Sequence, residues 1–321
     1  MHQEIQDAQD GTITLYNDYN IRVASQRTVE GEKFCLRLLK KNEGIRSIFD
    51  LGFPADEAVV RKCFDKRNSI TIVAAPTGQG KTTTLYSIID YLNRPEINIT
   101  TVEDPVEIRV PGINQIEIDE KSTFASALKA ILRNDPDIIL LGEVRDTESA
   151  EIAIQAGQTG HYVLSTIHTI NAIEVITRLR KMGISDYDIS STLATSLSQR
   201  LLRRVCPHCA IKRDFTAEER EIIKKYTNRY DVEFDLNGKH TYDTKGCPEC
   251  NFTGYLDRIA IFEILELTDE IKDAIVKGAS SLQIRELASK QGYKPLVVDA
   301  FQKVVDGITT VEEVNKRLAL Y

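Results

Sequence analysis

The sequence predicts an α/β fold, and three observations support this prediction. Apolar strands alternate with amphipathic helices over residues 55–200, which indicates a mostly parallel sheet covered by helices. A glycine-rich run, residues 75–83, lies between one such strand and one such helix. Two Cys-x-x-Cys pairs, at 206–209 and 247–250, indicate a separate metal-binding segment.

The first part of the chain, residues 12–39, is rich in β-forming residues whose polarity alternates. We expect three strands there, at 12–16, 20–25 and 33–39. Such a unit is too small for a core of its own, so we expect it to lean on the segments that follow. Residues 40–54 are a polar, glycine-containing connector.

The regular alternation of elements fills residues 55–200. We expect strands at 69–74, 98–102, 137–141 and 161–165. We expect helices, from apolar residues at helical spacing, at 55–65, 81–92, 123–133, 147–157, 171–181 and 186–202. Residues 203–257 hold the cysteine pairs and much polar loop, and residues 268–320 return to a helical pattern.

The glycine-rich run matches the phosphate-binding pattern G-x-x-x-x-G-K-[ST], with alanine in place of the first glycine. Backbone N–H groups of such a loop surround phosphate oxygens, and the helix that follows adds its positive end. The predicted nucleotide-binding residues are Ala75, Pro76, Thr77, Gly78, Gln79, Gly80, Lys81, Thr82 and Thr83. Lys81 is expected on the β- and γ-phosphates and Thr82 on Mg²⁺. Alanine at position 75 is tolerable where φ is negative.

Acidic residues follow two of the predicted strands. Residues 138–143 are Ile-Ile-Leu-Leu-Gly-Glu, so Glu143 is expected in the ligand crevice at the carboxyl edge of the sheet. Glu103 and Asp104 end another apolar segment. Their side chains point to opposite faces if the strand continues, so one of them is expected to face the nucleotide.

Two histidines flank the strand at 161–165. His168, at its carboxyl end, shares an edge of the sheet with Glu143 and the phosphate loop, which favours a contact with the γ-phosphate. For His161, at the other end, a structural and a functional role stay equally open.

The cysteines are of two kinds. The paired residues Cys206, Cys209, Cys247 and Cys250 suit a tetrahedral thiolate zinc site, and a redox dithiol or two disulfides are the alternatives. Cys35 and Cys63 stand alone in apolar surroundings, which predicts ordinary buried thiols.

Composition bounds the class of protein. The 321 residues leave room for two or three domains, and 42% hydrophobic and 28% charged residues are ordinary for a globular protein. A net charge of −7 gives no basic footprint for nucleic acid. The N-terminus has no signal-peptide pattern, and no apolar run approaches the ~20 residues that span a bilayer, so we expect a cytoplasmic protein.

Together these segments resemble the type II secretion and type IV pilus assembly ATPases of the secretion ATPase superfamily. The likeness covers essentially the whole chain from Gln9 onward. It is carried by four boxes in order: 75–84 as Walker A, 101–107 as the aspartate box, 132–146 as Walker B and 159–169 as the histidine box. The run Ser-Gln-Arg-Leu at 198–201, followed by the four cysteines, is similar to the assembly-type enzymes.

The resemblance implies a RecA-like P-loop motor domain, a PAS-like α+β N-terminal domain and a ring hexamer. We therefore expect a partial PAS-like domain at 1–42, a RecA-like ATPase core at 43–202, a zinc-binding lobe at 203–257 and a C-terminal helical subdomain at 258–321. The start of the chain matches a point midway through the PAS-like domain, which implies either a piece of a longer protein or a short natural member.

The resemblance also assigns residues outside the boxes. Arg22 and Arg37 match two arginines of the family's N-terminal domain that reach the phosphates, where a guanidinium would stabilise charge on the transferring phosphoryl group. Arg133 matches an arginine of the motor domain, and Lys129 takes the place of another. Asp104, within the aspartate box, is expected to help bind the nucleotide.

The function that the resemblance implies is a hexameric motor that hydrolyses ATP, with Mg²⁺ and a structural Zn²⁺, to assemble type IV pili or a type II secretion pseudopilus. Glu103 is expected to polarise the attacking water, with Glu143 as the alternative. Expected partners are further copies of the chain and an inner-membrane platform protein, so the chain would be peripheral, at the cytoplasmic face of the inner membrane. The alternatives are a competence-type DNA-uptake ATPase, a non-hydrolysing regulatory subunit and an ATP-switched nucleic-acid-binding protein.

Overall fold

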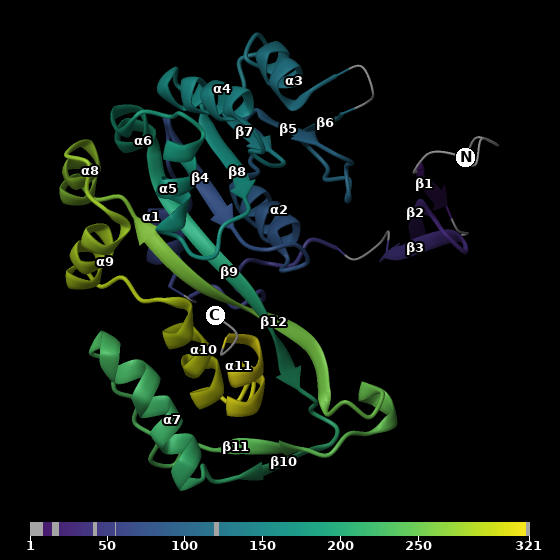
Figure 1. The fold of residues 1–321 in the computed structure, drawn as a ribbon, viewed down its shortest axis with the longest axis vertical. Helices are drawn as coiled ribbons and strands as arrows, with labels where there is room; N and C mark the ends of the chain where they lie inside the picture. Colours follow the sequence, from purple (N-terminus) through teal and green to yellow (C-terminus); the bar gives the residue numbers. More distant parts are fainter. Residues whose placement is uncertain (1–8, 15–18, 41–43, 55, 119–121, 319–321) are drawn as a thin grey trace.

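A computed structural model describes residues 9–14, 19–40, 44–54, 56–118 and 122–318. Its centre is a seven-stranded sheet with the strand order β12-β9-β4-β8-β7-β5-β6 (Figure 1). Six strands run parallel, and β12 pairs antiparallel with β9. The strands are β4 (Ser69–Ala74), β5 (Ile99–Glu103), β6 (Asn114–Glu117), β7 (Ile138–Leu141), β8 (Tyr162–Ile167), β9 (Leu193–Val205) and β12 (Tyr255–Glu266). The predicted mostly parallel α/β sheet is confirmed.

Helices cover both faces of this sheet. Side chains alternate along each strand, so that in β4 Ile70 and Ile72 join one buried cluster and Val73 joins the other. The Val73 side is covered by α1 (Glu57–Phe64) and α2 (Lys81–Leu92). The Ile72 side is covered by α3 (Phe124–Ile131), α4 (Thr147–Gln158), α5 (Glu174–Lys181), α6 (Asp186–Thr192), α8 (Asp269–Val276) and α9 (Ser281–Lys290).

A second lobe forms where β9 and β12 extend beyond the main sheet (Figure 1). Its apolar cluster joins Leu202 of β9 and Ile259 and Ile261 of β12 to the helices around them. These helices are α7 (Ala217–Thr227), α10 (Leu296–Val305) and α11 (Val311–Leu318). The lobe also holds the two-stranded sheet of β10 (Ala210–Arg213) and β11 (Thr241–Thr244), with the 3₁₀ turns η1 (Asn228–Tyr230) and η2 (Pro248–Cys250).

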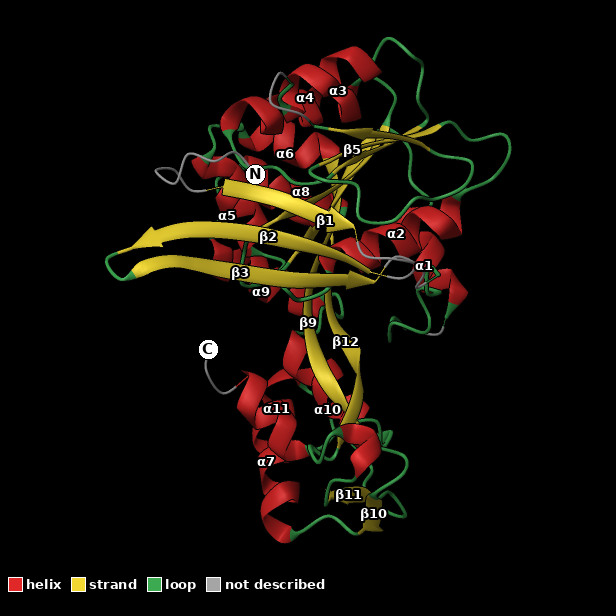
Figure 2. Ribbon diagram, turned by 90° about the vertical axis from the view of Figure 1, so that its right-hand side faces the viewer, coloured by secondary structure: helices red, strands yellow, loops and turns green. Residues whose placement is uncertain are grey.

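The N-terminal segment forms its own antiparallel sheet, in the order β1-β2-β3 (Figure 2). Its strands are β1 (Gln9–Thr14), β2 (Tyr19–Thr28) and β3 (Gly31–Lys40), which confirms the three predicted strands, although the end of the first, at residues 15–16, lies outside the described residues. The prediction for Cys35 was wrong, because this thiol is exposed on β3, an edge strand. Cys63, on α1, is buried as predicted.

The predicted helix at 186–202 was also wrong in its second half. Helix α6 ends at Thr192, and β9 begins at Leu193. Leucines at 193, 197 and 201 recur every four residues, which imitates a helix. The segment nevertheless lies between β4 and β12, where even Ser196 and Ser198 are fully buried.

The region 258–321, predicted as helical, likewise begins inside a strand. Residues Tyr255–Glu266 form β12, whose partner β9 lies far earlier in the chain. A strand that depends on so distant a partner leaves little local signal. The helices α8 to α11 then follow as the helical pattern predicts.

Candidate nucleotide-binding site and tetracysteine cluster

The phosphate-binding loop connects β4 to α2, in the strand–loop–helix arrangement that the sequence predicts. Gly78 and Gly80 adopt left-handed conformations, with φ of 74° and 80°. A Cβ atom at Gly80 would lie 3.1 Å from Nε2 of Gln199, so both conformation and space favour glycine there. The non-glycine residues with positive φ do not include Ala75, which agrees with its predicted tolerance.

Lys81 is the first residue of α2. Its Nζ donates to the carbonyl oxygen of Ala75 at 2.8 Å and lies 3.3 Å from Nδ1 of His168. Burial, followed by the positive charge of Arg200, lowers the pKa of Lys81 to about 8. The charge of this lysine is therefore not balanced by a nearby acid, which favours binding of an anion at its amine.

Glu143 and His168 meet at the carboxyl edge of the sheet, just after β7 and β8. Nε2 of His168 lies 3.4 Å from Oε2 of Glu143, and the guanidinium of Arg145 contacts the same carboxylate. Burial, then the charges of Lys81 and Arg145, lower the pKa of His168, so this ring is neutral at neutral pH. Because Lys81 donates to Nδ1, the ring proton belongs on Nε2, facing Glu143.

Glu103, the last residue of β5, is 4% exposed. Its Oε1 accepts from the hydroxyl of Thr101 at 2.6 Å and from the amide of Gln115 at 3.2 Å. Its Oε2 accepts from the hydroxyl of Tyr86. A buried carboxylate needs such donors, so Glu103 is fixed in one orientation.

One open cavity of about 140 Å³ lies beside the N-terminus of α2, and its wall does not include His168, Arg22 or Arg37. The predicted residues in its wall are Lys81, Thr82, Glu103, Asp104 and Glu143. Which of Glu103 and Asp104 faces the nucleotide stays a prediction, because both lie in the cavity wall. Strand β5 ends at Glu103, so the alternation of side chains ends there and both residues reach the cavity.

The N-terminal arginines lie on neighbouring strands. Arg22 of β2 and Arg37 of β3 are directly paired in the register of the two strands. Burial and the Glu103 charge raise the pKa of Glu107, a residue of the cavity wall, and the charges of Arg37 and Arg22 oppose this rise. The charges of the two arginines thus influence Glu107, and their contact with a nucleotide stays a prediction.

Three other residues lie elsewhere. Arg133 is exposed just before β7, at the amino edge of the sheet, and Lys129 forms an ion pair with Glu148 at 2.9 Å. His161 precedes β8, and its Nδ1 lies 3.0 Å from the carbonyl oxygen of Ala156. In this chain none of these three lines the cavity. The contact of His161 with Ala156 favours a structural role.

Two residues of the site were not predicted. Arg145, which contacts Glu143, also lies 3.7 Å from Asp104, so it links the two acidic segments. Tyr86 lies within the predicted helix at 81–92, and nothing in the sequence indicates that its hydroxyl meets Glu103. For Arg145 a signal existed: it lies two residues after Glu143, at the same edge of the sheet.

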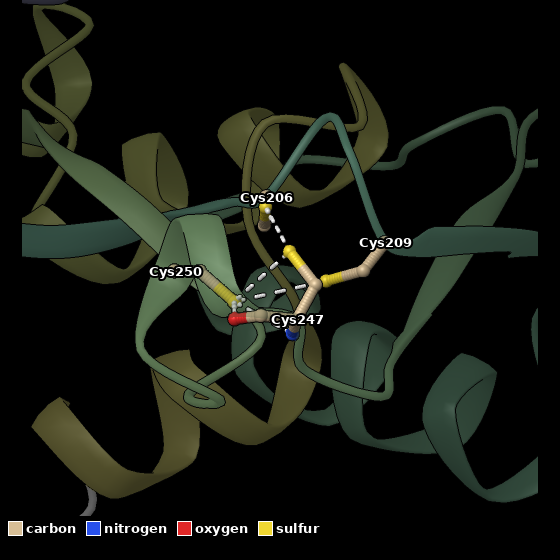
Figure 3. A group of neighbouring side chains, drawn as sticks. All are labelled: Cys206, Cys209, Cys247 and Cys250. Carbon is tan, nitrogen blue, oxygen red and sulfur yellow. Dashed lines mark hydrogen bonds between the residues drawn. The ribbon is translucent and has the colours of Figure 1, made fainter.

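The four paired cysteines come together at the far end of β9 (Figure 3). All four Sγ atoms lie within 4.8 Å of one another, and the closest pairs are 3.7, 3.8 and 3.9 Å apart. Zinc–sulfur bonds of about 2.3 Å in a tetrahedron require sulfur separations of about 3.8 Å. Three of the sulfur separations therefore match those of a tetrahedral zinc site.

The backbone around Cys250 supports a thiolate. Its Sγ accepts from the N–H groups of Cys247 and Gly254, each at 3.2 Å. Burial acts to raise the pKa of Cys250, but these backbone hydrogen bonds and those from the Cys247 and Cys209 thiols lower it to about 6, while burial and the neighbouring thiols raise the pKa of Cys209 to about 12. A thiolate is the form that binds zinc.

Comparison with known proteins then decides the family. The family described as "Type II/IV secretion system protein" matches residues 3–316. The chain belongs to this family. The resemblance that the four boxes indicate is thereby confirmed.

Curated members of the secretion family are similar along nearly the whole chain. The type IV pilus assembly ATPase PilB of Thermus thermophilus is 42% identical over 315 residues, 96% of this chain and 35% of the relative. The type II secretion system protein E of Xanthomonas campestris is 40% identical over 312 residues, 95% of this chain and 54% of the relative. The chain thus spans about half or less of the length of these relatives.

Two solved structures share the fold. The pilus retraction motor PilT with bound ADP has a TM-score of 0.69 and 25% identity, covering 96% of this chain and 77% of the other. The ATPase DotB of Legionella pneumophila has a TM-score of 0.68 and 20% identity, and the match covers 98% of this chain and 78% of the other.

Among the described residues, none of the helices is long and apolar enough to cross a bilayer.

Proposed function

We propose that this chain is the motor part of a secretion-family ATPase, which hydrolyses ATP to power assembly of a type IV pilus or a type II secretion pseudopilus. One observation carries this proposal: Lys81, Glu103 and Glu143, from three different boxes, converge on a single cavity at the carboxyl edge of the sheet. Phosphoryl transfer needs this combination of a phosphate cradle, a metal-orienting acid and an acid that positions water. The names of the relatives, pilus assembly ATPases and type II secretion proteins, support the same reading.

The residues of the cavity have distinct proposed roles. Lys81 and the amides of the loop would bind the β- and γ-phosphates, displacing Lys81 from the Ala75 carbonyl. Thr82 and Glu143 would hold Mg²⁺, which neutralises phosphate charge and orients the reacting oxygens. His168 would contact the γ-phosphate from its place between Lys81 and Glu143.

The acid that positions the attacking water is proposed to be Glu103. Arg145 and His168 both occupy the Glu143 carboxylate, which suits a role in holding the metal and its water shell. Glu103 is held by the neutral donors Tyr86, Thr101 and Gln115 and has no cation against it in the described contacts, which suits a fixed acceptor for a water proton.

The remaining parts of the chain are proposed to serve assembly and coupling. We assign residues 1–42 to a partial PAS-like domain, 43–202 to the motor core, 203–257 to a zinc lobe and 258–321 to a C-terminal subdomain. Arg22 and Arg37 would close over the γ-phosphate as the N-terminal sheet moves, within a ring of six chains. The zinc lobe is proposed to be structural or to dock a platform protein at the cytoplasmic face of the inner membrane.

Phosphate release from Mg·ATP tests the hydrolytic function. We expect steady turnover by the chain and a loss of at least about 100-fold in Glu143→Gln. Glu151→Gln, which neutralises an exposed acid on α4, is the matched control and retains the parental rate. Turnover of Glu143→Gln at the parental rate would contradict the assignment.

Sedimentation tests the ring. We expect the chain to shift toward a hexamer with a non-hydrolysable ATP analogue, and Arg22→Ala to weaken this shift. A chain that stays monomeric at saturating analogue would contradict the proposed ring for these 321 residues.

A further inference from the structure

The helix that begins with Lys81 also reaches Glu103. Tyr86 lies on α2, one and a half turns beyond Lys81, and its hydroxyl donates to Oε2 of Glu103. Both side chains are deeply buried, Tyr86 being 2% and Glu103 4% exposed, and both line the cavity. The element whose N-terminus faces the phosphates therefore also contacts the acid proposed to position water.

The direction of this hydrogen bond is fixed by its surroundings. The backbone N–H of Ile108 points at the tyrosine oxygen at 3.4 Å, so the oxygen accepts there and its own proton is directed to Glu103. Burial, followed by the hydrogen bond to Glu103, raises the pKa of Tyr86, so the phenol stays protonated. Tyr86 is a permanent donor to the carboxylate.

The two oxygens of Glu103 are held by different elements. Oε1 accepts from Thr101 and Gln115, and the Gln115 amide is itself held, since its oxygen accepts from the N–H of Val110 at 2.8 Å. Tyr86 holds Oε2 from the opposite side, the side of α2. Without the Tyr86 hydroxyl, Oε1 would keep its two donors, but Oε2 would lose the donor that fixes its place relative to Lys81.

We infer that Tyr86 is a positioning residue for catalysis, whose hydroxyl fixes Oε2 of Glu103 relative to the bound γ-phosphate. This inference rests on the proposed ATP hydrolysis and on Glu103 as the water-positioning acid. A water molecule that donates to Oε2 is placed by the same helix that places Lys81 and Thr82. Correct placement of a general base contributes about 10²–10⁴-fold to rate, so loss of one of its anchors affects kcat rather than ATP binding.

The chain offers a matched control. Tyr162 on β8 is also 2% exposed, and its hydroxyl donates to Oγ1 of Thr71 at 2.9 Å, away from the cavity wall. Tyr86→Phe and Tyr162→Phe each remove one buried hydroxyl and keep the ring, so similar decreases in melting temperature are expected. Stability alone cannot then explain a difference in turnover between them.

The test measures phosphate release at varied ATP for the parent, Tyr86→Phe, Tyr162→Phe, Glu103→Gln and the double variant Tyr86→Phe/Glu103→Gln. We expect kcat of Tyr86→Phe to fall about tenfold with KM within about twofold, and Tyr162→Phe to keep the parental kcat. In the Glu103→Gln background, Tyr86→Phe should change kcat less than about twofold, because the two residues act as one unit.

Three results would overturn the inference and separate its failure from that of the proposed function. Equal kcat for the two phenylalanine variants would remove the role of Tyr86 and leave ATP hydrolysis intact. A tenfold decrease in kcat from Tyr86→Phe that persists in the Glu103→Gln background would show that Tyr86 acts through another group. Absence of turnover in the parent chain would contradict the proposed function itself, and this inference with it.

Discussion

Nζ of Lys81 lies 3.3 Å from Nδ1 of His168. The other ring nitrogen of His168 faces Glu143, so this histidine connects the phosphate-binding loop to the acid that follows β7. Both groups can donate a hydrogen bond to an anion, so the contact leaves a place where we expect phosphate to bind. Burial, followed by the charge of Arg200, lowers the pKa of Lys81 in the nucleotide-free protein. Nucleotide binding should raise this pKa again.

The pKa of Lys81 near 8 predicts a pH dependence of nucleotide binding. Below pH 8 the free protein carries the charged amine, and above it the amine is neutral, so affinity falls as pH rises through 8. Between pH 7.5 and 9.5 we expect the Kd of a fluorescent ATP analogue to increase at least about tenfold. Lys81→Arg keeps its charge over this range, so its Kd should stay nearly constant, whatever its absolute value. A parent Kd that does not vary with pH would contradict this account.

The tetracysteine cluster predicts one zinc ion per chain. Metal analysis of freshly purified protein should give a stoichiometry near one, and Cys209→Ser should lose the metal and melt at a lower temperature. Cys35→Ser and Cys63→Ser are the matched controls, since both thiols lie outside the cluster. Metal-free protein that melts at the same temperature as the metal-loaded chain would argue against a structural role.

The cross-strand pair Arg22 and Arg37 predicts a catalytic effect of the N-terminal sheet. Replacing either residue by alanine should lower kcat at least about tenfold with a smaller change in KM, because the guanidinium acts on charge that develops in the transition state. Arg27 lies on the same strand as Arg22, is exposed and pairs in register with Glu32, so Arg27→Ala should keep the parental kcat. Equal kcat for Arg22→Ala, Arg37→Ala and Arg27→Ala would exclude the arginines from the site.

The sequence was most informative where function requires a local pattern. The loop around Lys81 needs glycines at fixed spacing, and Glu143 and His168 each follow a short apolar strand. Parallel strands place their carboxyl ends at one edge, so proximity of these residues could be predicted before the structure. The cysteine pairs were predictable for the same reason, since two residues between ligands suit one metal.

The parts that could not be predicted depend on contacts between distant segments. The leucines of β9 recur every four residues, which predicts a helix. Only pairing with its neighbours β4 and β12 makes this segment a strand. Tyr86 lies on a helix face that reads as apolar core, and its role appears only once β5 brings Glu103 against it. Local patterns carry no information about such pairings.

The most direct test of the central claim, that ATP is hydrolysed in the cavity beside Lys81, is phosphate release by Lys81→Ala compared with Lys62→Ala. Lys62 is exposed on α1 and forms an ion pair with Glu266, outside the cavity wall. We predict that Lys62→Ala releases phosphate from Mg·ATP at the parental rate and that Lys81→Ala releases none above background. Turnover of Lys81→Ala at the parental rate would contradict the account.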